Sequence, residues 1–178
     1  MIQTTKFIIE IIFYLFFNLP VYLYIKYKNK TNPLSYLKLN NHPFKGILIG
    51  FLFSLLYVIL LISKNYLDAW DPFNFNIGIL WISGLLVGFL EEVPFRGFLL
   101  QKLNARMNFF FSNLVTTLIF LILHFPLWII TDKNVFEASI SISVVSFILG
   151  YLYKEFNTLW IPIILHSVFN ICVWIGLG

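Results

Sequence analysis

The chain is organised around Gly88-Phe89-Leu90-Glu91-Glu92-Val93-Pro94-Phe95-Arg96-Gly97. This stretch places two adjacent carboxylates and an arginine inside a segment that otherwise resembles a membrane-spanning helix. A charged side chain at the centre of a bilayer costs about 2.5–3.5 kcal/mol on insertion scales. Three such side chains together indicate a functional site, and they predict polar partners elsewhere in the chain.

The composition indicates an integral membrane protein. Of the 178 residues, 60% are hydrophobic and 11% are charged, whereas a soluble domain carries about 25% charged residues. The lysines cluster at predicted membrane edges, so the net charge of +4 does not indicate nucleic-acid binding. The single cysteine, Cys172, excludes an internal disulfide framework.

The apolar runs predict an all-α, polytopic bundle of about six helices. These cover approximately residues 7–25, 44–63, 77–106, 111–130, 138–153 and 159–175. We interpret the chain as one integral membrane domain. Residues 1–76 supply two accessory transmembrane helices and a basic loop, and residues 77–176 supply a four-helix catalytic core.

Basic residues predict the orientation of this bundle. Nine lie in the loops of one side: Lys26, Lys28, Lys30, Lys38, Lys45, Arg96, Lys102, Arg106 and Lys154. Three lie on the other side: Lys6, Lys64 and Lys133. Because Lys and Arg accumulate in cytoplasmic loops, we expect the first side to face the cytoplasm and both termini to lie outside.

Helical spacing divides the acidic motif into two parts. Glu92 and Arg96 are four residues apart, so they can form an ion pair on one helix face. Glu91 is rotated by about 100° from Glu92 and can point at something else. We therefore predict that Glu91 is the working carboxylate and that the pair supports it; the alternative is an ordinary Glu–Arg pair near a helix end. Pro94 cannot donate to the carbonyl of Leu90, so the helix should bend or open beside Glu91.

Three further polar residues lie in apolar helices and can partner Glu91. His124 follows Phe120 by four residues, and Asn170 follows His166 by four, so each pair shares a face. Counting along the helices places Glu91 and His166 at similar depth, whereas His124 comes out closer to the outer side. A lone histidine in a membrane helix usually forms interhelical hydrogen bonds, but one carboxylate, two imidazoles and a carboxamide from three helices can perform hydrolysis.

Two mechanisms of hydrolysis fit this set. A carboxylate and a histidine can deprotonate a water while the second histidine and the asparagine donate to the oxyanion. Alternatively, Glu91, His124 and His166 can be the three ligands of a zinc ion that activates the water. Cys172 lies six residues after His166 and off its face, which disfavours a Cys–His nucleophile pair.

Small residues predict close helix packing. Gly84 and Gly88 are four residues apart and let another helix approach that face. The serines between residues 139 and 146, among them Ser146, are interpreted as interhelical hydrogen-bonding residues and not as nucleophiles.

The ordered motifs Glu91-Glu92-x-x-x-Arg96, Phe120-x-x-x-His124 and His166-x-x-x-Asn170 resemble those of the CPBP family. This family is also called the Abi or CAAX-protease-like family. The resemblance covers approximately residues 77–175 and implies intramembrane proteolysis, described for this family both as glutamate-type and as metal-dependent. It implies water activation by Glu91 and His124, and oxyanion stabilisation by His166 and Asn170.

Three functions follow from these observations. The first is an intramembrane endopeptidase that acts on a membrane-anchored peptide, protein or lipoprotein from the cytoplasmic side. The second is acyl transfer to the N-terminal amine of a membrane lipoprotein by the same residues. The third is a non-catalytic protein of the bacteriocin-immunity kind, whose polar residues only fasten helices together. In each case we expect a multi-pass protein of a bacterial cell membrane.

Overall fold

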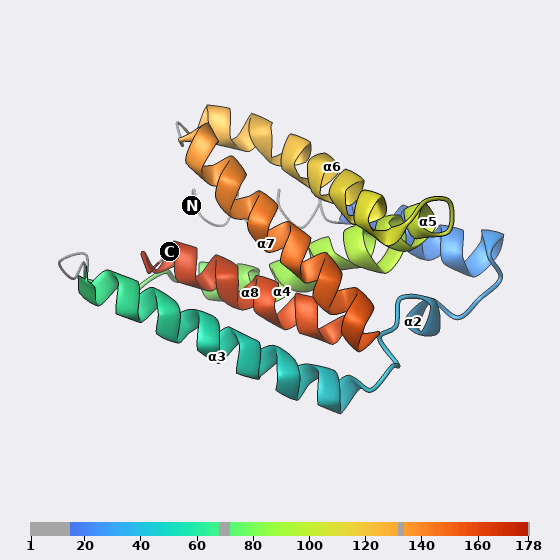
Figure 1. The fold of residues 1–178 in the computed structure, drawn as a ribbon, viewed down its shortest axis with the longest axis horizontal. Helices are drawn as coiled ribbons and strands as arrows, with labels where there is room; N and C mark the ends of the chain where they lie inside the picture. The colour runs from blue at the N-terminus through green and yellow to red at the C-terminus, as the bar shows by residue number, and fades with distance from the viewer. Residues whose placement is uncertain (1–14, 68–71, 132–133, 178) are drawn as a thin grey trace.

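The computed structural model describes residues 15–67, 72–131 and 134–177 (Figure 1). Across these ranges the secondary structure is helical, and none of the described residues forms a strand. The predicted all-α class is therefore confirmed.

The first described helix covers residues 15–23 and continues as a wider π-helical turn, η1 (Tyr24–Lys28). Residues 7–14 of the first predicted helix lie outside the described residues. The basic loop that follows contains a short helix, α2 (Pro33–Tyr36), which the hydrophobic pattern did not predict. Asn32 explains its start, because Oδ1 of this residue accepts a hydrogen bond from the Leu34 N–H at 2.9 Å.

Three helices are long and apolar enough to cross a membrane: α3 (Pro43–Leu67), α6 (Phe109–Ile130) and α7 (Val135–Phe156). The helix α8 (Trp160–Trp174) is apolar but shorter. Asn134 caps α7 by accepting from the backbone N–H groups of its first turn, and α7 ends where Asn157 adopts a left-handed conformation.

The motif helix is not continuous. It consists of α4 (Leu80–Glu92), the π-helical segment η2 (Val93–Leu100) and the short α5 (Gln101–Asn104). The break falls directly after Glu92 and next to Pro94, which has no N–H to donate within the helix. The predicted opening of the helix beside the carboxylates is therefore present, as a change of helical pitch.

The helix α8 lies at the centre of the arrangement, with α3 and α4 packed against it, while α6 packs against α7 (Figure 1). Glycines explain the close approach of α4. A Cβ on Gly84 would lie 2.6 Å from Cγ1 of Ile171, and one on Gly88 would meet the Ile163 carbonyl oxygen and the Ser167 hydroxyl. The predicted glycine face is thus the contact between α4 and α8.

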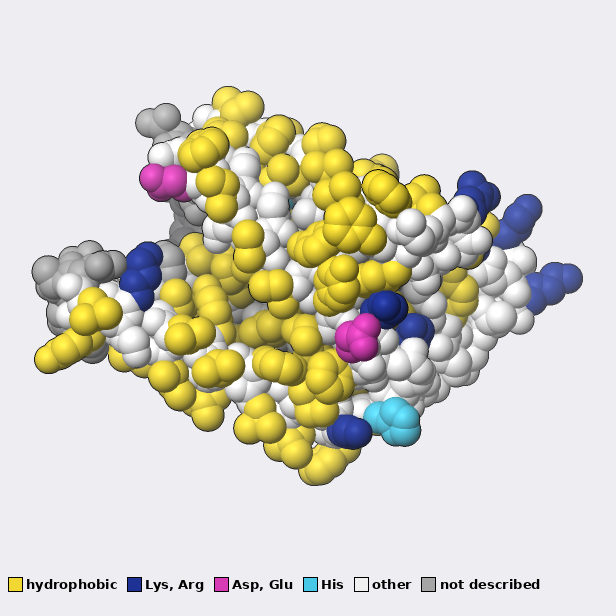
Figure 2. Space-filling view, in the orientation of Figure 1, with side chains coloured by type: hydrophobic (Ala, Val, Ile, Leu, Met, Phe, Trp, Pro, Cys, Tyr) yellow, Lys and Arg dark blue, Asp and Glu magenta, His cyan; other side chains and the backbone are white. Residues whose placement is uncertain are grey.

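The surface identifies an integral membrane protein. Hydrophobic side chains cover much of the face of the molecule that Figure 2 shows. Phe51, Leu55 and Ile59 on α3 are among the exposed large hydrophobic residues. In a membrane protein lipid tails cover such a face, whereas a soluble monomer rarely exposes one of this extent. Figure 2 shows lysine and arginine side chains gathered mainly toward the end of the molecule that carries α2 and α5.

Candidate active site

A fully buried ion pair lies at the junction of α4 and η2. Nη1 of Arg96 donates to Oε1 of Glu92 at 2.8 Å, and both side chains are 0% exposed. Nη2 of Arg96 also donates to Ser146 on α7, at 3.0 Å to its carbonyl and 2.7 Å to its hydroxyl. The Ser146 hydroxyl in turn donates to Thr117 on α6 at 3.0 Å. The predicted pair is present, and Ser146 is the predicted interhelical hydrogen-bonding residue.

Phe120 packs beside Arg96 and beside both histidines. Its ring packs edge-on against Phe95, with centroids 4.8 Å apart, and lies 5.1 Å from Cζ of Arg96. The same ring lies 4.4 Å from the His124 ring and 5.9 Å from the His166 ring. The guanidinium lies within cation–π distance of the aromatic ring, which favours its buried position. Phe120 therefore packs against both histidines and fixes their relative position.

Glu92 does more than pair with Arg96. Its Oε1 atom also accepts a hydrogen bond from Nδ1 of His166 on α8, at 2.6 Å. Because the carboxylate accepts from Nδ1–H, the opposite nitrogen of His166 points away from the ion pair. Besides its predicted pairing with Arg96, Glu92 thus also contacts the α8 histidine, which the sequence analysis did not anticipate.

Glu91 is the point on which both histidines converge. Its Oε2 atom lies 3.6 Å from Nε2 of His166 and 4.0 Å from Nε2 of His124. The side chains of Glu91 and His124 are 14% and 21% exposed, in contrast to the fully buried ion pair. Three helices thus bring two imidazole nitrogens to one carboxylate oxygen, Oε2 of Glu91, which is itself buried although the side chain that carries it is partly exposed.

The tautomer of His124 follows from its backbone contact. Nδ1 of His124 lies 2.8 Å from the carbonyl oxygen of Phe120, one turn earlier in α6. A carbonyl can only accept, so Nδ1 carries a proton and the Nε2 atom of the neutral ring presents its lone pair toward Glu91. This arrangement suits a general base.

The predicted depth of His124 was wrong. Counting residues placed it nearer the outer side than Glu91, whereas its Nε2 atom lies 4.0 Å from that carboxylate. The count assumed helices that begin in one plane. In the structure α6 is 22 residues long and α8 is 15, so equal depth falls at different positions along each helix.

Asn170 lies one turn after His166 on α8, as predicted, but its amide turns back on its own helix. Nδ2 of Asn170 donates to the carbonyl oxygen of His166 at 3.2 Å. An amide nitrogen carries two protons, so one N–H remains for another acceptor. The structure thus places Asn170 beside the histidine without a hydrogen bond to Glu91 or His124 among those of the described residues.

The candidate zinc ligands Glu91, His124 and His166 converge, with wider spacings than ligands have around a bound zinc ion. Tetrahedral zinc ligands about 2.0–2.2 Å from the metal lie about 3.3 Å from one another, and the contacts of Glu91 to the two imidazoles are 3.6 and 4.0 Å. Within the described residues, no three His, Cys, Asp or Glu side chains come close enough together to hold a metal ion. Cys172 is buried against Ile77 and Ile175 and lies apart from this site.

The sequence analysis did not identify Asn18, which contacts the backbone beside Glu91. Nδ2 of Asn18, in the first described helix, donates at 2.7 Å to the carbonyl oxygen of Leu90. This is the carbonyl whose usual α-helical donor would be residue 94, a proline. The lone amide in an apolar run was the available signal, because such residues form interhelical hydrogen bonds in membranes.

Comparison with known proteins identifies the family. The type II CAAX prenyl endopeptidase Rce1-like family matches residues 72–172, which is more than half of the chain. The chain belongs to the Rce1-like family. The resemblance to CAAX-protease-like proteins is thereby confirmed. The matched region begins before α4 and ends within the last turn of α8, and it includes Glu91, His124, His166 and Asn170.

A curated relative supports the same assignment. The chain is 29% identical over 89 residues to the Bacillus subtilis (strain 168) protein named "Putative membrane peptidase YdiL". The alignment covers 50% of this chain and 33% of that protein, so the chain spans about a third of the relative's length. No solved structure matches the chain significantly. This Rce1-like chain is an integral membrane protein.

Proposed function

We propose that this Rce1-like protein hydrolyses a peptide bond in a membrane-associated peptide or protein, with Glu91 and His124 activating a water. The observation that carries the proposal is the 4.0 Å separation between Oε2 of Glu91 and Nε2 of His124. This separation exceeds a direct hydrogen bond, yet one water can lie about 2.8 Å from both atoms.

Water activation follows from the chemistry of these two groups. His124 Nε2 presents a lone pair toward the Glu91 carboxylate, and both atoms can accept a proton from a water held between them. The hydroxide equivalent then attacks the peptide carbonyl carbon. The proton taken from the water passes to the leaving amine as the tetrahedral intermediate collapses, so that the pair acts first as base and then as acid.

The developing oxyanion needs hydrogen-bond donors. We assign this role to Nε2 of His166 and to the second N–H of Asn170. Since Nδ1 of His166 already donates to Glu92, donation from Nε2 requires the imidazolium form. The 2.6 Å hydrogen bond to Glu92 fixes the direction of the ring.

Arg96 accounts for the position of Glu92. The Arg96 guanidinium donates to Oε1 of Glu92, one turn earlier in the same helix. The guanidinium also donates to Ser146 on α7, and the Ser146 hydroxyl in turn donates to Thr117 on α6. A histidine oriented by a carboxylate that is itself fixed is the arrangement used by many hydrolytic sites. This division makes Glu91 a catalytic residue and Glu92 a positioning residue.

The activity can be tested in cells that carry the gene. Membrane-protein N-termini are compared by mass spectrometry in cells with and without it. The proposal predicts N-termini that appear only when the gene is present. A changed lipid mass on a lipoprotein, without any new N-terminus, would instead support acyl transfer by the same residues.

A further inference from the structure

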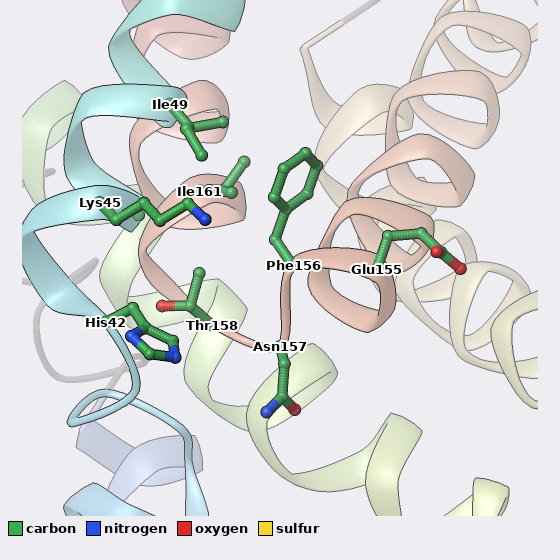
Figure 3. Close-up of a pocket in the computed structure, with 9 residues that line it drawn as sticks. His42, Lys45, Ile49, Glu155, Phe156, Asn157, Thr158 and Ile161 are labelled. Carbon is green, nitrogen blue, oxygen red and sulfur yellow. The ribbon is translucent and has the colours of Figure 1, made fainter.

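A hollow lies away from the proposed active site, where the start of α3 meets the loop that joins α7 to α8 (Figure 3). It has a volume of about 240 Å³. Its lining shares no residue with the catalytic set and consists of His42, Lys45, Gly46, Ile49, Glu155, Phe156, Asn157, Thr158 and Ile161. It therefore needs an explanation of its own.

One part of this hollow carries hydrogen-bond donors. Lys45 and His42 come from the start of α3, and Thr158 faces them from the loop before α8 (Figure 3). Thr158 is 2% exposed, and its hydroxyl oxygen accepts from the Trp160 N–H at 3.5 Å, so its own proton can be donated into the hollow. The only acidic residue of the lining, Glu155, points away and pairs with Lys154 at 3.4 Å.

The start of α3 adds to this positive character. The helix begins at Pro43 and is 25 residues long. The first N–H groups of a helix have no partner within it, and the helix dipole places partial positive charge there. Phosphate groups bind at helix N-termini for both reasons. Here the N-terminus coincides with a lysine and a buried hydroxyl.

The opposite part of the hollow is apolar. Ile49 of α3 and Ile161 of α8 line it, and Phe156 closes one side (Figure 3). A free inorganic anion gains nothing from such a wall. An amphiphile can place a phosphate at the basic part and its hydrocarbon against the isoleucines.

The loops that form the hollow are tied together. The side-chain amide of Asn41 donates to the Asn157 carbonyl at 3.2 Å, and Nε1 of Trp160 donates to the Leu39 carbonyl at 2.8 Å. A glycine lets α3 approach this loop closely, because a Cβ on Gly46 would lie 3.0 Å from both Oγ1 and Cγ2 of Thr158. The site is thus preformed, and binding requires little reorganisation.

We propose that this hollow binds the phosphate headgroup of an anionic phospholipid. The chemistry is that of a phosphate with attached hydrocarbon, recognised by Lys45, His42 and the Thr158 hydroxyl. Basic pockets between transmembrane helices on the cytoplasmic side commonly hold such headgroups. The predicted orientation places this end of the bundle in the cytoplasmic leaflet.

The experiment uses the purified full chain in detergent and native mass spectrometry. Phosphatidylglycerol, phosphatidylcholine and inorganic phosphate are added separately. We expect retained phosphatidylglycerol, and we expect Lys45→Ala to weaken it about fivefold, the contribution of one basic side chain near an anionic lipid. Lys45→Arg keeps the charge and should retain binding. Arg106→Ala, an exposed residue predicted on the same side but outside the lining, is the matched control.

Three outcomes would overturn the proposal. Equal retention of phosphatidylglycerol by the wild type and Lys45→Ala would show that the lipid binds elsewhere. Equal retention of phosphatidylcholine would remove the role of negative charge, and binding of inorganic phosphate at the same concentration would indicate a free-anion site. Since Lys45 is exposed, the variant should fold, and its unfolding temperature without lipid checks this. None of these readouts depends on the peptidase activity.

Discussion

Nδ1 of His166 donates to Oε1 of Glu92 at 2.6 Å, while Nε2 of the same ring lies 3.6 Å from Oε2 of Glu91. One imidazole therefore connects the two adjacent carboxylates of α4. Glu92 is 0% exposed and paired with Arg96, whereas Glu91 is partly exposed and lies between the two histidines. Neighbouring glutamates with the same intrinsic chemistry therefore have different surroundings.

Glu92→Gln should destabilise the protein and lower its activity. The glutamine leaves Arg96 buried without a counter-charge and weakens the acceptor for His166. Breaking a buried pair on one side typically costs about 3–5 kcal/mol. We expect a lower unfolding temperature and less folded protein in the membrane.

Glu155→Gln is the control for that prediction. Glu155 forms an exposed pair with Lys154, and exposed pairs contribute little to stability. The unfolding temperature of Glu155→Gln should match the wild type. A Glu92→Gln protein as stable as this control would refute the structural role of the buried pair.

Asn18→Asp should lower activity with a smaller effect on stability. The substitution keeps the shape but removes the N–H that donates to the Leu90 carbonyl beside Glu91. One hydrogen bond contributes about 0.5–1.5 kcal/mol. We expect a loss of turnover number in a cleavage assay, since the η2 turn is then less firmly fixed.

The control for Asn18 is Asn65→Asp, which makes the same change of an amide to a carboxylate on α3, a helix that does not carry the motif. If both variants retain wild-type turnover, the contact of Asn18 with Leu90 has no role in positioning Glu91.

Chelation should leave the activity intact. The contacts of Glu91 to the two histidines fit a bridging water, and the proposed mechanism needs no metal. The measurement combines elemental analysis of the purified protein with a cleavage assay after treatment with a strong zinc chelator. A loss of activity that added zinc restores, together with one zinc per chain, would replace the water-activating pair with a three-ligand metal site.

The helices and the ion pair followed from the sequence because both depend on local spacing. Apolar runs mark α3, α6, α7 and α8, and a separation of four residues brings Glu92 to Arg96. The break after Glu92 followed from Pro94, whose missing N–H acts within one turn.

Contacts between helices were less accessible to sequence reasoning. The link from His166 to Glu92 joins residues 74 positions apart and depends on how α8 is rotated and staggered against α4. The predicted depth of His124 was wrong for the same reason, because the stagger of one helix against another is set by packing and not by residue count. Asn18 was missed although the freed Leu90 carbonyl had been anticipated, since several polar side chains could have supplied the donor.

The central claim is that Glu91 performs chemistry while Glu92 positions a histidine. Glu91→Gln tests it most directly, because the amide keeps the shape of the side chain and removes the base. The measurement is the set of membrane-protein N-termini in cells that express wild type or Glu91→Gln at equal abundance. The account predicts that the new N-termini disappear with Glu91→Gln while the folded protein persists at wild-type abundance. The same N-termini at the same yield in the variant would contradict it.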